Sequence, residues 1–544
     1  MKQITIPHRI SRFGPIFTAI QFIAVLAWSD AFADSATWNL DPHNGDWNNA
    51  ANWTPATVPD GSADVATFEI SNTTAIHASK ITDAERIIFN PGASSFTITT
   101  ENDTLLALHG AGIVNLSGAV QNFVVPNGGS LVTFAFRFFG SSSAGSDTVY
   151  TVHTSAEGGF PAGIGFDEDS GAGMATIVLD GALRPAGTYN ARCFFFTSST
   201  ADHAHLFMNG GLVSEGSGGS AEFYQTSTAG SAILTANGGQ VSGAFGGLIR
   251  FDNDATAGNA TLIANGGTNG ASSGTILFQT DTSGGNARVQ LHDNATLEIG
   301  CHSSPGVGIG SLQGSGIVAL GSNELTVGSN GLDTLFSGTI GFAGSCPGQQ
   351  GSLKKVGPGR LALTNRNTYK GGTRIVEGTL LVNNKGGSGT GTGPVKVDSG
   401  TLGGHGKIAG TVTIGSGSSQ GAFIAPGGKA GVDVASLTIK NTLSFNSDGQ
   451  YACSLDSNAG TADTIVVGGG VTLDPAAQIV LTDFGTDILT PGTVFTVIDN
   501  AGATPIAGAF GNLADGAIVT VNGNNLQASY TGGDGNDLTL TVVQ

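Results

Sequence analysis

A pair of histidines and two clusters of acidic residues have a spacing in this sequence that could suit metal binding. His203 and His205 flank Ala204 on one expected strand, so both side chains point to the same face. Two histidines at positions i and i+2 can bind a metal ion, but the sequence supplies no evident third ligand. The sequence also lacks the G-x-S-x-G, H-E-x-x-H and phosphate-loop motifs.

Two short acidic clusters lie at expected turns, Asp167-Glu168-Asp169 and Asp252-Asn253-Asp254. Carboxylate oxygens suit hard cations such as calcium. Asp169 and Asp254 occupy the same position relative to the preceding phenylalanine, but we do not expect stacked coils to present a row of metal ligands at this position. We interpret both clusters as solvated turns.

Two motifs resemble those of known families. The stretch 404–407, Gly-His-Gly-Lys, is similar to the G-H-G of polygalacturonases, but those enzymes also need paired aspartates and no Asp-Asp pair occurs here. We therefore interpret His405 as a surface residue. The stretch 532–537 resembles the calcium-binding nonapeptide of RTX proteins, which needs tandem copies. One copy is present, so we predict a Gly/Asp hairpin turn, with calcium as the minor alternative. No catalytic, cofactor-binding or metal-ligating residue is predicted.

A sixfold repeat governs the middle of the chain. Six phenylalanines are separated by 28, 29, 28, 28 and 27 residues, namely Phe138, Phe166, Phe195, Phe223, Phe251 and Phe278. Eleven residues after each stands an aliphatic residue, namely Val149, Ile177, Leu206, Leu234, Leu262 and Val289. A fixed period of 20–50 residues is typical of solenoids.

Alternating small or apolar residues predict strands in each copy, and helical periodicity is nearly absent. Asn-Gly pairs at 209–210, 237–238 and 265–266 predict tight turns with positive φ. A coil of about 28 residues has room for three strands, and stacking equivalent positions places Phe on Phe. We predict an all-β, right-handed parallel β-helix. A propeller would need repeats of about 40–50 residues.

Residues 1–33 have the features of a Sec signal peptide. Lys2, Arg9 and Arg12 precede an apolar stretch, and Ala31 and Ala33 suit a cleavage site. The alternative is a membrane anchor, but the apolar run is short for one. No later stretch predicts a transmembrane segment. Removal of this segment leaves 18 basic against 39 acidic residues, which argues against nucleic acid as a partner.

Four cysteines lack metal-binding spacing. A Cys301–Cys346 disulfide and buried free thiols both fit the sequence. Glycine accounts for 87 residues and charged residues for 11%, which is unusual but compatible with a packed core at 39% hydrophobic content.

The region from 34 to 137 is less regular and contains Trp38, Trp47 and Trp53 among several asparagines. A β-helix must cover its first open coil, so we interpret these tryptophans as an N-terminal cap. The alternative is a platform on which sugar rings stack.

The stretch 351–383 carries the most specific motif. It reads GSLKKVGPGRLALTNRNTYKGGTRIVEGTLLVN and closely resembles the passenger-associated transport repeat, also called the autotransporter-associated β-strand repeat. This family implies a pectin-lyase-like parallel β-helix that is displayed or released outside the cell. The pattern runs to Val543-Gln544 without a series of about ten-residue amphipathic strands, so we expect the C-terminal autotransporter barrel to be absent.

These observations predict five regions. They are a signal peptide (1–33), a cap with the first coils (34–137), the six-copy array (138–300), coils with the passenger-associated repeat (301–400) and C-terminal coils with a cap (401–544). We expect an exported, non-catalytic, adhesin-like protein, secreted or on the outer surface of a Gram-negative-type bacterium, with the periplasm as an alternative location. Its partners would be extracellular or cell-envelope glycans or proteins. A polysaccharide lyase or glycoside hydrolase would instead need carboxylates with Arg or Lys on one exposed sheet face, and we expect no such cluster. A carbohydrate-binding module is the remaining alternative.

Overall fold

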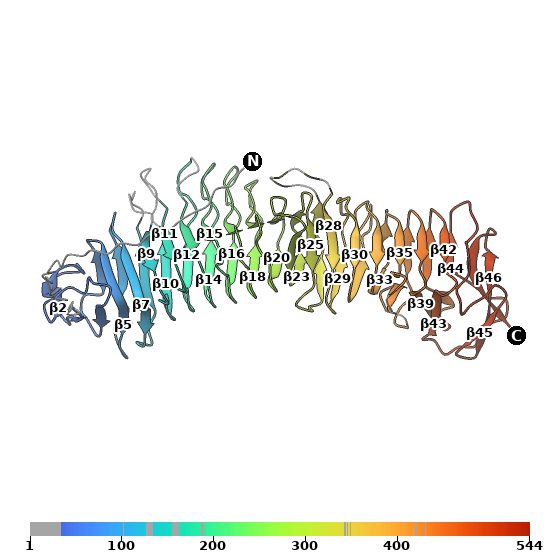
Figure 1. The fold of residues 1–544 in the computed structure, drawn as a ribbon, viewed down its shortest axis with the longest axis horizontal. Coiled ribbons are helices and arrows are strands. Elements are labelled where there is room, and N and C mark those ends of the chain that lie inside the picture. Colours follow the sequence, from blue (N-terminus) through green and yellow to red (C-terminus); the bar gives the residue numbers. More distant parts are fainter. Residues whose placement is uncertain are drawn as a thin grey trace, which may run out of the picture.

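The computed structural model describes residues 34–101, 103–126, 134–154, 163–185, 190–341, 344, 346, 348, 350–418, 421–429 and 431–544. The predicted signal peptide lies outside the described residues. The chain forms an elongated rod in which successive coils follow one another from the N-terminal to the C-terminal end (Figure 1). Nearly every strand pairs in parallel with a strand of the next coil, so the prediction of a parallel β-helix is confirmed.

Four sheets, named A to D here, run along the rod. Sheet A is 14-stranded and contains, in spatial order, β2 (Trp53–Thr54), β1 (Ala36–Trp38), β3 (Val65–Phe68), β5 (Thr82–Phe89), β7 (Leu106–Asn115), β9 (Phe134–Phe138), β11 (Gly163–Phe166), β13 (Arg192–Phe195), β15 (Ser220–Phe223), β17 (Leu248–Phe251), β19 (Thr275–Phe278), β21 (Thr296–Glu298), β24 (Ile317–Ala319) and β27 (Thr339–Gly341).

Sheet B extends along almost the whole rod. Its parallel strands are β4 (Ala75–Ala78), β6 (Thr97–Thr100), β8 (Gln121–Val125), β10 (Thr148–Val152), β12 (Thr176–Leu179), β14 (His205–Met208), β16 (Ile233–Ala236), β18 (Thr261–Ala264), β20 (Arg288–Leu291), β23 (Ser311–Gly314), β26 (Thr334–Phe336), β29 (Arg360–Leu363), β31 (Thr379–Val382), β33 (Gly400–Gly404), β36 (Ala422–Pro426), β39 (Gly449–Asp456) and β43 (Gln478–Asp483). The short β40 (Thr461–Ala462) pairs antiparallel with β39.

Sheets C and D belong to the C-terminal half. Sheet C is 8-stranded and contains β22 (Gly306–Ile309), β25 (Glu324–Val327), β28 (Ser352–Lys355), β30 (Thr373–Ile375), β32 (Val395–Val397), β35 (Val412–Ile414), β38 (Leu443–Phe445) and β42 (Val471–Leu473). Sheet D is 7-stranded and contains β34 (Lys407–Ile408), β37 (Ser436–Ile439), β41 (Thr464–Val467), β44 (Val494–Asn500), β47 (Asp537–Val543), β46 (Asn524–Gly532) and β45 (Ile518–Val521).

The repeat phenylalanines form one continuous stack inside the rod. From Phe138 to Phe278 the successive ring centroids are 4.8, 4.8, 4.5, 4.8 and 4.9 Å apart, and the rings are nearly parallel. All six rings are buried. This stack arises because the strand register of sheet A places each Phe opposite the next. The predicted Phe ladder is confirmed.

The prediction of three strands in each coil of the array was wrong. On the third side of the coil, a single-residue bridge ladder replaces a strand, joining Ser143, Gly171, Thr200, Thr228, Thr256 and Ser283. In the array, each sheet A strand from β9 to β19 ends two residues before a residue with positive φ, such as Thr197 at 53° or Gln225 at 58°. That conformation turns the backbone sharply, so a strand cannot continue.

Two details of the predicted repeat differ in the structure. In the first copy, Tyr150 and not Val149 pairs with Ile177 and lies in the core, because the register is displaced by one residue. In the Asn-Gly pairs, no positive φ is found. Instead, the amide of Asn237 donates to Asn209 Oδ1 at 3.0 Å, as part of an asparagine ladder up the rod. A Cβ at Gly238 would lie 2.2 Å from the carbonyl oxygen of Gly266, so close stacking requires glycine.

Both ends of the rod are covered. Trp38, Trp47 and Trp53 are buried, with centroids 5.0 Å apart for Trp38–Trp53 and for Trp47–Trp53. At the other end, Asn512 bonds both the N–H (3.0 Å) and the carbonyl (2.7 Å) of Ile479 in β43. The Asn512 bonds occupy backbone groups of β43, the last strand of sheet B, that would otherwise be free to pair with another chain. The tryptophans are thus a cap, and their buried rings do not form the alternative sugar platform.

The short 3-10 helix η1 (Ala50–Asn52) lies within the N-terminal cap. In the part of the chain that the structure describes, no helix has the length and apolar character needed to cross a membrane.

Candidate ligand-binding surface on sheet A

Aromatic and charged side chains gather on the outer face of sheet A. Residues at alternate positions of each strand face outward, and the register aligns these positions from coil to coil. The resulting surface is called the aromatic–arginine strip here and consists of His109, Phe134, Arg137, Phe139, Asp167, Arg192, Phe194, Phe196, Glu222, Tyr224, Arg250 and Asp252. The strip spans the coils from β7 to β17.

Arg137 lies between two rings at the N-terminal end of the strip. Its guanidinium carbon is 4.8 Å from the Phe134 centroid and 4.7 Å from the Phe139 centroid, and its Nε donates to Asp167 at 2.8 Å. His109 stacks on Phe139 at 5.1 Å. Cation–π contacts of this kind hold a guanidinium flat against the surface. The charge of Arg137 is therefore compensated and fixed in place.

Further rings continue the strip toward the C-terminal coils. Phe134 packs edge-on against Phe194 at 5.8 Å, and Phe196 stacks with Tyr224 at 5.7 Å. The Arg250 guanidinium carbon is 5.6 Å from the Tyr224 centroid. The four rings are half-buried, so each keeps part of its surface in contact with solvent.

Arg250 joins two carboxylates. Its Nη2 donates to Asp252 Oδ2 at 2.5 Å, and its Nη1 lies 3.7 Å from Glu222 Oε2. Burial alone would raise the pKa of Asp252. Hydrogen bonds from the Asn253 backbone, Thr280 and Arg250 outweigh burial and hold that pKa below its ordinary value.

Glu222 also accepts a hydrogen bond from the Tyr224 hydroxyl at 2.5 Å. Burial, together with the carboxylate of Glu222, raises the pKa of Tyr224 well above its ordinary value. The phenol therefore stays protonated at neutral pH and acts as a donor.

Arg192 is held by a chain of hydrogen bonds but has no carboxylate partner among the described residues. Its Nε donates to Asn190 Oδ1 at 2.8 Å, and Asn190 Nδ2 donates to Ser220 Oγ at 3.1 Å. Ser220 Oγ in turn donates to Glu222 Oε1 at 2.9 Å. The Arg192 guanidinium carbon is 6.0 Å from the Phe194 ring centroid, and no carboxylate of the described residues forms an ion pair with this exposed arginine.

A groove of about 440 Å³ lies over this part of the strip. Its floor is formed by β13, β15 and β17, and its lining includes Arg192, Phe194 and Tyr224. Phe245, which is 50% exposed, lines the groove from the loop between β16 and β17. Aromatic surface with a few placed polar groups is typical of ligand sites.

The expectation of no charged cluster on an exposed sheet face was wrong. Arg137, Asp167, Glu222, Arg250 and Asp252 lie on one face in the middle of the rod. Most of them are separated by about one coil in sequence, and stacking brings them together. The sequence contained an indication of this cluster, because Asp167 and Asp252 each directly follow a repeat phenylalanine and so occupy equivalent positions in their coils. These two aspartates are paired with arginines and not simply solvated.

The other residues singled out in the sequence do not join this surface. His203 and His205 are exposed beside sheet B, and His405 is exposed in the turn after β33. Gly535 N–H donates to the carbonyl of Gly532 at 2.8 Å, so the stretch 532–537 is the predicted hairpin turn between β46 and β47. Within the described residues, no group of three or more His, Cys, Asp or Glu side chains could hold a metal ion. The prediction that calcium is not needed stays a prediction.

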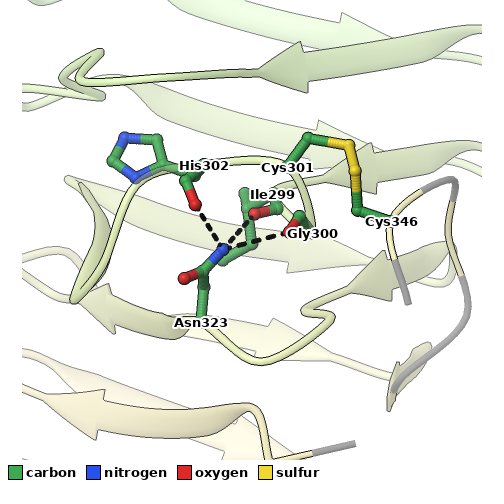
Figure 2. Close-up of a disulfide and its surroundings, with 6 residues drawn as sticks. All are labelled: Ile299, Gly300, Cys301, His302, Asn323 and Cys346. Atoms are coloured by element: carbon green, nitrogen blue, oxygen red, sulfur yellow. Dashed lines mark hydrogen bonds between the residues drawn. A yellow bond between two sulfur atoms is a disulfide. The ribbon is translucent and has the colours of Figure 1, made fainter. Parts of the chain in front are cut away.

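A disulfide lies where the array meets the C-terminal half. Cys301 and Cys346 are bonded, with a Cα–Cα distance of 5.2 Å, while Cys193 and Cys453 are buried free thiols. Figure 2 shows Asn323 beneath this turn, where its amide donates to the carbonyls of Ile299 at 2.8 Å and His302 at 2.9 Å. Of the two alternatives left by the sequence, the disulfide forms for one pair and the free thiols for the other.

The passenger-associated segment uses buried polar residues to fix its turns. Lys355 is 1% exposed, and its Nζ donates to the carbonyls of Val356 and Gly357, both at 2.7 Å. Burial lowers the pKa of Lys355 to about 8. Asn367, also buried, accepts from Ile340 N–H at 2.7 Å and donates to the Gly389 carbonyl at 2.6 Å. The motif residues therefore hold neighbouring coils together.

The fold and this segment define the class of the protein. Residues 353–382 match the Passenger-associated-transport-repeat family, which confirms the resemblance predicted for 351–383. The chain is a parallel β-helix that carries this repeat.

Two known proteins are similar to it. The Adhesin BmaC autotransporter of Brucella suis biovar 1 (strain 1330) is 31% identical over 192 residues, which is 35% of this chain and 5% of that protein. The chain thus spans a small part of the curated relative that it matches. The crystal structure of the Haemophilus influenzae Hap adhesin overlaps 90% of this chain and 65% of that chain at 10% identity and a TM-score of 0.25.

Proposed function

We propose that this chain is an exported, adhesin-like passenger that works through its surface and not through catalysis. The observation that carries the proposal is a passenger-associated repeat built into a continuous β-helical rod. The similarity to an autotransporter adhesin over 192 residues supports the same conclusion. The location would be the outer surface of a Gram-negative-type bacterium or the surrounding medium.

The shape of the molecule suits this role. A rod whose coils contact only their neighbours presents a long, regular surface at low cost in core residues. The strip on sheet A is the part of that surface where aromatic rings and arginines are held in fixed positions. We expect binding of extracellular glycans or proteins to use such a surface.

A test is surface display in the bacterium that encodes the chain. An epitope can be inserted at Gly460, which lies in an exposed turn where an added Cβ would meet no atom within 4 Å. External protease should remove the epitope from intact cells, or the tagged chain should be in the medium. Deletion of the coding sequence should lower adhesion to host cells or to other surfaces. Retention of the epitope inside intact cells, together with unchanged adhesion of the deletion strain, would overturn the proposal.

A polysaccharide lyase or glycoside hydrolase is the second candidate, because Glu222, Arg250 and Asp252 meet on an exposed sheet face. Against catalysis, both carboxylates are engaged by Arg250, and the Glu222 side chain is 9% exposed. Catalytic acid and base groups must reach the scissile bond. Sustained release of reducing or unsaturated ends from acidic glycans, abolished in Glu222→Gln, would replace the adhesin proposal with this one.

A further inference from the structure

We propose that the groove over β13, β15 and β17 binds a linear polysaccharide that contains uronic acid residues. The inference rests on the proposed function and names both the binding face and the class of ligand. Three features of the groove support it: an arginine without an ion pair to any described residue, a set of partly exposed rings, and floor strands whose backbone groups are already paired.

The first feature is the charge of Arg192. The chain carries a formal net charge of −19, and on the strip Arg137 and Arg250 are already paired with carboxylates. Arg192 makes no ion pair with any described residue, although it is exposed and its Nε is tied to Asn190. A guanidinium held in this way presents its Nη groups to a carboxylate and can form two parallel hydrogen bonds. The groove therefore selects an anionic group at this point.

The second feature is the arrangement of rings. Phe194 and Tyr224 lie on neighbouring coils with centroids 6.4 Å apart, and Phe245 lines the same groove. Sugar rings have apolar C–H faces that pack against aromatic faces, while their hydroxyls need polar partners. Asn190, which is half-buried and lines the groove, supplies such a partner. Stacking surface and hydrogen-bonding groups are thus both present beside the arginine.

The third feature distinguishes a glycan from a peptide strand. Extended peptides commonly bind by pairing with the free edge of a sheet. Every strand in the groove floor is paired on both sides within sheet A, so its backbone groups are already used. Recognition must come from side chains alone. Because Phe196 and Phe134 continue the strip beyond the groove, the surface fits a repeating linear polymer.

The experiment measures binding of the purified full chain to three probes by calorimetry in low salt with a chelator present. The probes are an alginate oligosaccharide (polyuronic acid), a neutral β-glucan oligosaccharide and poly-glutamate. Alginate should bind, and the neutral glucan and poly-glutamate should bind at least about tenfold more weakly. Equal binding of poly-glutamate would overturn recognition of a glycan, and equal binding of the glucan would overturn the role of the uronic carboxylate. Absence of alginate binding would overturn the whole inference.

Variants locate the site. Arg192→Ala and Phe194→Ala should each weaken alginate binding about tenfold, with unchanged far-UV circular dichroism. Arg288→Ala is the matched control, because Arg288 is an exposed arginine on sheet B without an ion pair to a described residue, and it should bind as the wild type does. Raised salt should weaken the wild type more than Arg192→Ala. Equal losses in Arg288→Ala and Arg192→Ala would show nonspecific charge attraction and overturn the assignment.

The inference and the proposed function fail separately. If displayed cells adhere and the double variant Arg192→Ala/Phe194→Ala adheres equally well, the strip is not the binding face and the proposed function stands. If the purified chain binds alginate through Arg192 but the chain never reaches the cell surface or the medium, the proposed function fails and the site stands.

Discussion

Phe194 and Phe195 are adjacent in β13, yet their rings lie on opposite sides of sheet A. Phe195 is fully buried, with the rings of Phe166 and Phe223 at 4.8 and 4.5 Å on either side. Phe194 is half-buried and meets Phe134 edge-on at 5.8 Å. Replacing each by alanine therefore tests which side of the strand supplies stability and which supplies binding.

The magnitudes follow from burial. Phe195→Ala removes a whole buried ring from a close-packed stack and should lower the free energy of unfolding by about 4 kcal/mol. The neighbouring coils are rigid in register, so we expect the cavity to collapse little. Phe194→Ala removes a ring that is already partly in water, and its cost should be about 1 kcal/mol or less. The two variants differ in stability by roughly 3 kcal/mol on this reasoning.

Guanidinium chloride unfolding, followed by far-UV circular dichroism, measures both changes. The transition midpoint should fall clearly for Phe195→Ala and hardly at all for Phe194→Ala, with similar denaturant slopes. Phe195→Leu, which keeps most of the apolar volume, should lie between Phe195→Ala and the wild type. Equal losses for the two alanine variants, or a larger loss for Phe194→Ala, would refute the assignment of inner and outer faces.

Three further predictions concern the C-terminal half. The Cys301→Ser/Cys346→Ser variant should be about 4 kcal/mol less stable, because the bond closes a loop of sequence separation 45; reductant should destabilise the wild type similarly and leave the variant unchanged. Burial lowers the pKa of Lys355 to about 8, so the unfolded state binds more protons than the folded state between pH 8 and about pH 10.4. The free energy of unfolding of the wild type, relative to that of Lys355→Met, should therefore rise by about 3 kcal/mol as the pH is raised across this window. A difference in denaturation midpoints that stays constant or falls would contradict this prediction. Asn367→Ala should cost about 3 kcal/mol in chemical unfolding because two buried backbone partners lose their hydrogen bonds, whereas Asn365→Ala, at an exposed position of the same turn, should change stability by less than about 0.5 kcal/mol.

Much of the candidate surface was hidden from the sequence for a simple reason. Glu222 and Arg250 are 28 residues apart, and the residues beside each of them in the chain do not indicate that these two side chains meet. Their positions become equivalent only through the register of β15 and β17. The periodicity of the phenylalanines could have supplied this register, since residues equally distant from a repeat phenylalanine stack on one another. Applying it to charged as well as apolar positions would have exposed the cluster.

The Asn-Gly pairs show where local sequence preference predicted the wrong backbone geometry. Asn-Gly pairs are typical of turns with positive φ, but Asn209, Asn237 and Asn265 instead form a ladder of side-chain amides. Local propensity did not reveal this, because a ladder exists only when equivalent residues of successive coils are stacked. The same holds for Tyr150, which replaces Val149 in the core of the first copy.

The sequence alone determined the class of fold, the stacked phenylalanines and the passenger-associated segment. Each of these depends on residues that recur at a fixed spacing. Because the recurring positions are buried, they are apolar, and the repeat can be recognised in the sequence. Only the tertiary structure showed which side chains share the outer face of sheet A. It also showed that a bridge ladder forms the third side of each array coil and that Cys301 forms a disulfide with Cys346. Those outcomes depend on the register between coils and on the shape of each turn, where energies of a few kcal/mol from packing override local preference.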